Sequence, residues 1–159
     1  MASAAEILEW VKATLDRNEI TYELDSDVEE GQVERLSLTY ELESKVGSTY
    51  ISIECSEDRF NFHSFANVVE EEHRHRVAEY FMRILPHFPF GCLGVSFESG
   101  VASFFQIGYC DDETHVSESL IRCINNAFDL WGQFGDGLYD IINYVKTPKA
   151  AVEEATMDE

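Results

Sequence analysis

The pattern of hydrophobic and polar positions divides the chain into helical and extended stretches. Near the N-terminus, Ser3 and Glu6 have capping-box spacing, and apolar residues then recur at helical spacing to about Asp16. From residue 20 to residue 65 the apolar period changes to two, with hydrophilic breaks at 25–31, 44–48 and 57–58. Alternating stretches separated by such breaks predict three or four strands of an antiparallel meander.

A second helix and a hairpin are predicted after the meander. Three glutamates at 70–72 begin the helix, where carboxylates favour the positive end of the helix dipole, and Pro86 ends it. The hairpin then has one strand at 93–97, a turn at 98–100, and a returning strand in which the odd-numbered residues from Val101 to Tyr109 alternate with their neighbours.

The segment after Thr114, a candidate N-cap, is the most informative helix. Two neighbouring apolar stripes run along it and together make a face too wide for contact with one sheet. We therefore expect a second cover, either the helix at 70–85 or a second subunit. The candidate interaction surface on this helix consists of Ile121, Ile124, Phe128, Trp131 and Phe134.

The C-terminal part of the chain is predicted to contain a turn and a short last helix. Glycines at 132, 135 and 137 are expected to end the long helix in a tight inter-helix turn. Thr147 and Pro148 then have the spacing of a polar cap followed by proline at the first helical position. Residues 1–147 form one predicted α+β domain, and residues 148–159 a short acidic helix or tail that belongs to it.

The predicted fold class is α+β, with a twisted antiparallel sheet packed against helices in the order α-β-β-β(-β)-α-β-β-α-α. The length of 159 residues is sufficient for a buried core. Charge says more about possible partners than length does, because 31 acidic and 11 basic residues give a net charge of −20. Such a field repels nucleic acid and anionic membranes and attracts basic partners, and it also keeps apolar surface in solution.

The sequence also indicates a cytoplasmic protein. No window approaches the apolar length of a membrane span, and the N-terminus carries charge where a signal peptide needs its apolar core. Four scattered cysteines without a C-x-x-C pair are most simply reduced thiols. Of these, Cys55 and Cys123 have core spacing, whereas Cys92 and Cys110 lie at strand ends, where we expect greater exposure and leave a redox role open.

None of the candidate metal, calcium or dinucleotide sites has the residue spacing that such a site requires. His73 and His75 lie about 200° apart on a helix, so they cannot coordinate the same metal ion. We expect both to lie on an exposed face of the helix. The acidic stretch 25–31 has the wrong spacing for a calcium loop. The glycines of 132–137 follow a helix rather than a strand, unlike a dinucleotide site. We expect no catalytic residue, metal or cofactor, and therefore no enzyme.

A family resemblance adds to this interpretation. Stretch 71–105 combines an acidic opening, Val77-Ala78-Glu79-Tyr80, the strand at 93–97 and Glu98-Ser99-Gly100-Val101; stretch 130–155 ends on Thr147-Pro148 and an alanine-rich helix. These features resemble the YbjN-domain family, in motif from about residue 71 onward. The resemblance implies the fold of type III secretion chaperones, commonly dimeric, and a sensory-transduction or client-binding role without catalytic residues.

Two functions are compatible with the sequence. The first is a non-enzymatic protein-binding module with a chaperone-like or regulatory role, a homodimer that holds an unidentified client protein. The alternative is a small-ligand sensor or enzyme with an apolar pocket between the sheet and the helices, for which Phe60 and Phe62 are the candidate lining. Aromatic residues at regular spacing also pack against one another in ordinary cores.

Overall fold

The fold is α+β, as predicted. The computed structural model describes residues 1–25 and 34–157, and in these ranges it has four α-helices and six strands in the order α-β-β-β-β-α-β-β-α-α. The helices are α1 (Ala4–Arg17), α2 (Arg74–Ile84), α3 (Glu113–Ile142) and α4 (Pro148–Ala155), and a 3-10 turn (Glu71–His73) precedes α2. The strands are β1 (Glu23–Leu24), β2 (Glu34–Glu41), β3 (Ser48–Ser56), β4 (Arg59–Val68), β5 (Cys92–Val95) and β6 (Val101–Tyr109).

The strands form a single antiparallel sheet in the order β1-β2-β3-β4-β6-β5. Strands that follow one another in the chain are neighbours in the sheet, except that β4 pairs with β6 rather than with β5. The β5–β6 hairpin therefore places β5 at the edge. The extended stretch at 20–24 contributes just two residues, because only Glu23 and Leu24 pair with β2. The sheet is therefore open, with a short strand at each edge.

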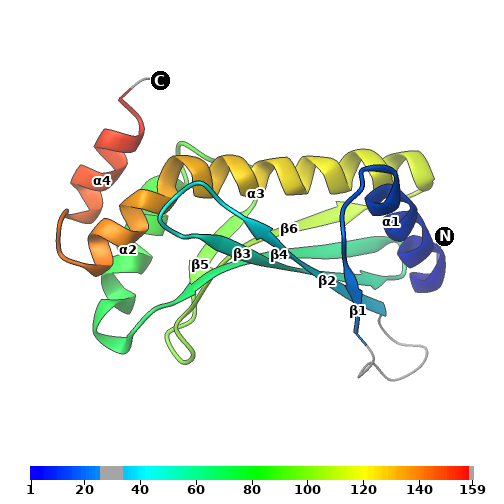
Figure 1. Cartoon of the computed structure of the whole chain (residues 1–159), viewed down its shortest axis with the longest axis horizontal. Helices are drawn as coiled ribbons and strands as arrows, with labels where there is room; N and C mark the ends of the chain where they lie inside the picture. The colour runs from blue at the N-terminus through cyan, green and yellow to red at the C-terminus, as the bar shows by residue number, and fades with distance from the viewer. Residues whose placement is uncertain (26–33, 158–159) are drawn as a thin grey trace.

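All four helices lie on one face of the sheet (Figure 1). The long helix α3 runs across this face, with α1 packed near one end and α2 and α4 near the other (Figure 1). Fully buried side chains from β2, β3, β4 and β6 meet α1 and α3 in the core, among them Leu36, Ile53, Phe62 and Phe104. The opposite side of the sheet, here called the open face, carries no helix.

The predicted helix caps at both ends of the chain are confirmed. At α1 the Glu6 amide donates to Ser3 Oγ at 3.2 Å, and the Ser3 amide donates to a Glu6 carboxylate oxygen at 2.9 Å. At α4 the Ala150 amide donates to Thr147 Oγ1 at 3.2 Å, and Pro148 occupies the first turn. Both caps depend on residues three apart, which explains why sequence alone identified them.

The start of α3 differs from the prediction by two residues. Asp112, rather than Thr114, is the N-cap, because its carboxylate accepts a hydrogen bond from the His115 amide at 2.9 Å. Thr114 lies inside the first turn. A carboxylate at this position also interacts favourably with the positive end of the helix dipole, which a hydroxyl does not.

The predicted break at the glycines is wrong, because α3 continues without interruption from Glu113 to Ile142. A Cβ atom at Gly135 would lie 2.6 Å from Ser44 Oγ, and one at Gly137 would lie 2.9 Å from the Tyr80 ring carbon Cζ. Two of the glycines therefore let neighbouring elements approach the helix closely. Packing against these neighbours outweighs the helix-propensity cost of about 1 kcal/mol per glycine.

None of the helices in the described ranges combines the length and the apolar character that a membrane crossing requires.

Candidate interaction surface

The predicted interaction surface on α3 is largely buried within the chain itself. Ile124, Trp131 and Phe134 expose 4%, 1% and 1% of their surface, so they cannot form an external binding face. The second cover that the wide apolar face requires comes from α1, α2 and α4, which all contact α3. Ile121 and Phe128 remain partly exposed, and the Phe128 ring packs edge-on against Tyr40 at 4.7 Å.

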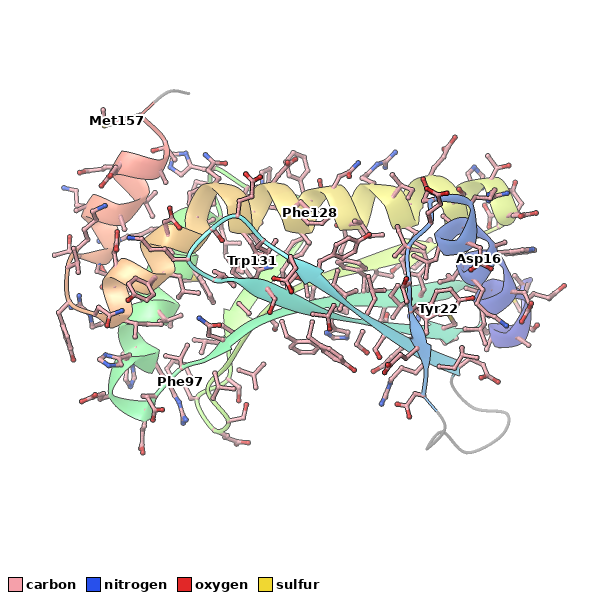
Figure 2. All side chains as sticks on the ribbon, in the orientation of Figure 1. Asp16, Tyr22, Phe97, Phe128, Trp131 and Met157 are labelled. Carbon is pink, nitrogen blue, oxygen red and sulfur yellow. The ribbon has the colours of Figure 1, made fainter. Side chains whose placement is uncertain are left out.

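Trp131 lies between α3 and the sheet (Figure 2), where a buried hydroxyl pair satisfies its polar atom. The indole Nε1 donates to Ser64 Oγ at 2.9 Å, and Ser64 Oγ lies 2.6 Å from Thr49 Oγ1. Thr49 Oγ1 donates its proton to the Phe65 carbonyl at 2.9 Å, so Ser64 must donate to Thr49. This network gives Trp131 a structural role in joining the helix to the sheet.

Phe60 and Phe62, the candidate pocket lining, are both fully buried. A Cβ atom at Gly108 would lie 2.9 Å from the Phe60 ring carbon Cε2, so the ring packs tightly against β6. The main surface hollows of the described residues are lined by other side chains, and neither phenylalanine contributes to them. The two rings are core residues, as regular strand spacing of aromatics would suggest.

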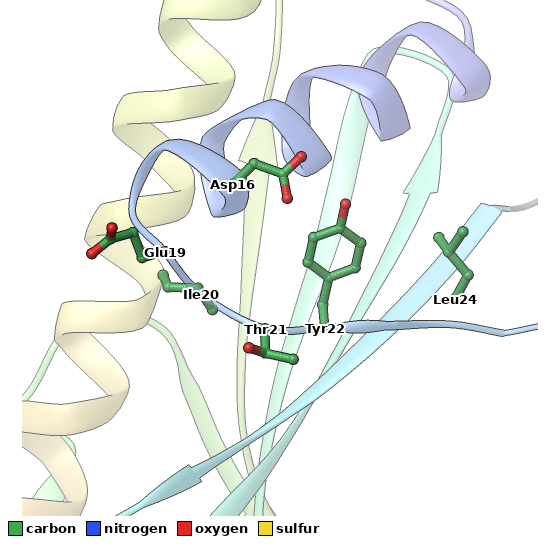
Figure 3. A pocket seen from close by; sticks show the side chains of 6 residues that line it. All are labelled: Asp16, Glu19, Ile20, Thr21, Tyr22 and Leu24. Carbon is green, nitrogen blue, oxygen red and sulfur yellow. The ribbon is translucent and has the colours of Figure 1, made fainter.

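The largest of these hollows, about 620 Å³, lies beside the C-terminal end of α1 (Figure 3). The Tyr22 hydroxyl points towards Asp16 (Figure 3), and burial, followed by the charge of Asp16, raises the pKa of Tyr22. The lining consists of Asp16, Glu19, Ile20, Thr21, Tyr22 and Leu24. The Tyr22 phenol therefore stays neutral at neutral pH and is not a nucleophile there.

Asp140 on α3 is a buried carboxylate that serves as a structural tie. Lys45 Nζ and Lys146 Nζ lie 3.0 Å and 3.1 Å from its carboxylate oxygens. The hydrogen bond from Lys45, and then that from Lys146, lower the pKa of Asp140 against the opposing effect of burial. The carboxylate therefore stays ionised and paired, which joins the β2–β3 loop and the segment before α4 to α3 and excludes Asp140 as a general acid.

The histidines offer no metal centre within the part of the chain that the structure describes. His75 is exposed, as predicted, but the expected exposed face does not include His73, which is buried with its ring 5.1 Å from that of Tyr144. His73 is the last residue of the 3-10 turn before α2 rather than part of α2, and its ring contacts Tyr144 in the segment after α3, so the spacing of a regular helix did not apply to it. Most of the acidic stretch at 25–31 lies outside the described residues.

Three of the four cysteines are buried. Cys55 and Cys123 are core residues, as predicted. The greater exposure predicted for Cys110 is wrong: its side chain is 1% exposed, and its amide donates to the Asp58 carbonyl at 2.9 Å. Burial raises the pKa of these thiols to about 12, 12 and 11 respectively, so they are not nucleophiles at neutral pH. Cys92 alone among the four is exposed, on the edge strand β5.

The open face of the sheet carries an aromatic surface that the sequence analysis did not identify. We call Tyr50, His63, Phe65 and Phe105 the open-face cluster. The His63 ring stacks on Phe65 at 5.7 Å and lies 4.7 Å from Phe105, and Tyr50 is 6.0 Å from Phe65. These side chains come from three adjacent strands, so the rings form one contiguous group across β3, β4 and β6.

Register explains why these rings point outward. His63 pairs with both Ser52 and Phe105, while their neighbours Phe62 and Phe104 are buried under the helices. The odd-numbered residues of β6, from Val101 to Tyr109, therefore occupy the open face. The even-numbered residues Ala102, Phe104 and Gly108 face the core. Because β6 is apolar on both faces, alternation alone could not show which set is covered.

His63 is the titratable member of the open-face cluster. Its surroundings are the rings of Phe65 and Phe105, with Glu54 on β3 and Arg35 on β2 nearby. Burial lowers the pKa of His63, Arg35 lowers it further, and Glu54 opposes the change. The imidazole is therefore held in its neutral form on an aromatic surface.

Comparison with known proteins gives no assignment: no family model, no curated protein and no solved structure matches the sequence. The resemblance to the YbjN-domain family therefore stays a prediction, and function rests on the geometry of the chain.

Proposed function

We propose that this chain is a non-enzymatic protein-binding module with a chaperone-like or regulatory role, acting as a homodimer that holds a client protein. The observation that supports it is the open-face cluster, an aromatic surface on a sheet whose other face is fully used by helices. Tyr50 is exposed, and His63, Phe65 and Phe105 are partly exposed. Contiguous aromatic side chains at a surface are enriched where proteins bind other proteins.

The chemistry of the remaining residues agrees with a binding role. The buried thiols are neutral and Asp140 is locked in ion pairs, so these groups are not suited to catalysis. The net charge of −20 favours a basic client on the acidic parts of the surface. All four cysteines are free, which suits the reducing cytoplasm as the proposed location. The likeness to YbjN-domain and secretion-chaperone proteins belongs to the same proposal.

A photo-crosslinking amino acid tests whether the open face binds protein. It replaces Tyr50, which is 48% exposed on the open face, and in a matched control it replaces Met82, which is 68% exposed on α2 in the helical layer. Illumination in the producing cells should give a defined protein adduct at position 50 and none at position 82. Equal labelling at both positions, or no adduct at position 50, would contradict the proposal.

A further inference from the structure

The centre of the open face is uncharged in a strongly charged chain. Two adjacent cross-strand rows cover it, one through Ser37, Ser52, His63, Phe105 and Cys92, the other through Thr39, Tyr50, Phe65, Ser103 and Gly94. None of these ten positions is Asp, Glu, Lys or Arg, although charged residues make up 26% of the chain. The first charged residue of these rows is Glu23 at the sheet edge, which pairs with Ser37. With His63 held neutral, these ten positions carry no net charge.

Charge decides which kind of partner suits these rows. A basic client is attracted to the acidic surface elsewhere and gains nothing electrostatic from an uncharged patch. A second copy of this chain also carries −20, so two copies repel wherever acidic surface meets acidic surface. The uncharged rows are the part of the sheet where two copies can meet without bringing like charges together.

The shape of the open face is self-complementary. The large side chains of the open-face cluster form a ridge, and small residues lie on both sides of it: Ser37, Ser52 and Thr39 towards β2, and Ser103 and Gly94 towards β5. In an interface with a two-fold axis, the same surface appears on both partners. The ridge of one copy can then lie against the small residues of the other.

The size and twist of the sheet also suit a second copy. Strands β2, β3, β4 and β6 have 8, 9, 10 and 9 residues. At about 3.4 Å per residue and about 4.8 Å per strand, they cover roughly 31 by 19 Å, or about 600 Å² before side-chain relief, which is the area of the whole open face with its charged margins at Arg35 and Glu54. Relief and β5 raise this towards the ~800 Å² that each partner of a standard interface buries. Two sheets of the same twist pack face to face at about −30°.

We propose that a second copy of this chain covers the open face, so that the two sheets pack against each other through the uncharged rows and the helices lie outside. This inference rests on the proposed function, because it assigns the partner of the same surface. It also leaves the acidic parts of the surface of each copy free for a basic client.

Sedimentation velocity with light scattering tests the inference on the purified full chain. The wild type should sediment as a dimer at micromolar concentration. Tyr50→Asp introduces a charge into the uncharged rows of both partners and should weaken the dimer at least about tenfold. Met82→Asp adds the same charge in the helical layer and should leave the dimer unchanged.

A second variant distinguishes a weakened dimer from a misfolded chain. Ser103→Asp lies in the same row as Tyr50 but removes no ring contact, and circular dichroism checks that each variant is folded. A wild type that remains monomeric to about 100 µM, or equal weakening by Tyr50→Asp and Met82→Asp, would overturn the inference. A monomer that still crosslinks to another protein from position 50 would overturn the second copy and retain the protein-binding function; a monomer without adducts would overturn both.

Discussion

At the scale of single residues, the open face depends on a histidine that is kept neutral. His63 stacks on Phe65 and lies against Phe105, and partial burial by these rings disfavours the charged imidazolium. The nearby charges, Glu54 and Arg35, act in opposite directions on its pKa. Cys92 lies on the far side of Phe105 in the same row. Burial therefore remains the main influence on the protonation of His63.

This predicts a contribution of His63 to the pH dependence of stability. In the unfolded chain His63 has its usual pKa of 6.5, and in the folded chain the pKa is lower, so the unfolded state takes up the proton first on acidification. The free energy of unfolding should therefore fall as the pH drops below 6.5, until folded His63 is also protonated. His63→Gln should lose less stability over this window.

Urea unfolding between about pH 7.5 and pH 5.5 measures this difference. The other histidines and the carboxylates are common to both proteins, so the difference between the wild type and His63→Gln isolates the single imidazole. Parallel pH profiles would show that the rings around His63 do not disfavour its charge.

At the scale of elements, α3 is the organising helix because other elements approach it at its glycines. Gly135 admits the β2–β3 loop at Ser44, and Gly137 admits the Tyr80 hydroxyl, which donates to the Phe134 carbonyl at 2.7 Å. Tyr80 is fully buried, and burial raises its pKa, so it remains a neutral donor. Gly132 has a different environment, because a Cβ atom at this position would have no neighbouring atom within 4 Å outside its own helix turn.

Alanine substitutions at two glycines should therefore have opposite effects. Gly132→Ala should raise the free energy of unfolding by about 0.5–1 kcal/mol, because alanine is the better helix former and its methyl group meets open space. Gly137→Ala should lower it by about 1–3 kcal/mol, because the methyl group displaces the buried Tyr80 ring. Urea unfolding of both variants gives the comparison, and a similar change in both would contradict the close-approach explanation.

At the scale of the whole molecule, the distribution of charge separates two kinds of surface. The central rows of the open face are uncharged, whereas the chain as a whole carries −20. At low ionic strength the long-range repulsion between two copies opposes any dimer, even one whose contact surface is neutral. Salt screens this repulsion, with a Debye length of about 10 Å at 0.1 M.

Salt should therefore strengthen the proposed dimer. The dissociation constant from sedimentation should fall several-fold as sodium chloride rises from about 20 mM to about 300 mM. Binding of a basic client to the acidic parts of the surface should weaken over the same range. A dimer that loosens with salt would instead be held by opposite charges, and would not be the neutral sheet-to-sheet arrangement.

Sequence alone determined the features that arise from residues close together in the chain. The caps at Ser3 and Thr147 depend on neighbours three positions away, and the meander depends on an apolar period of two, so both could be predicted along with the α+β fold class. The neutral core thiols at Cys55 and Cys123 belong to the same local patterns.

Tertiary structure decided the features that depend on distant partners. Whether α3 breaks at Gly137 depends on Tyr80, and whether its wide apolar face stays exposed depends on α1, α2 and α4. Trp131 thus moved from the candidate surface into the core, and the aromatic surface lies instead on the open face around Phe105. A pattern shows that a face is apolar; only the packing of segments far apart in sequence determines which of two apolar faces is covered.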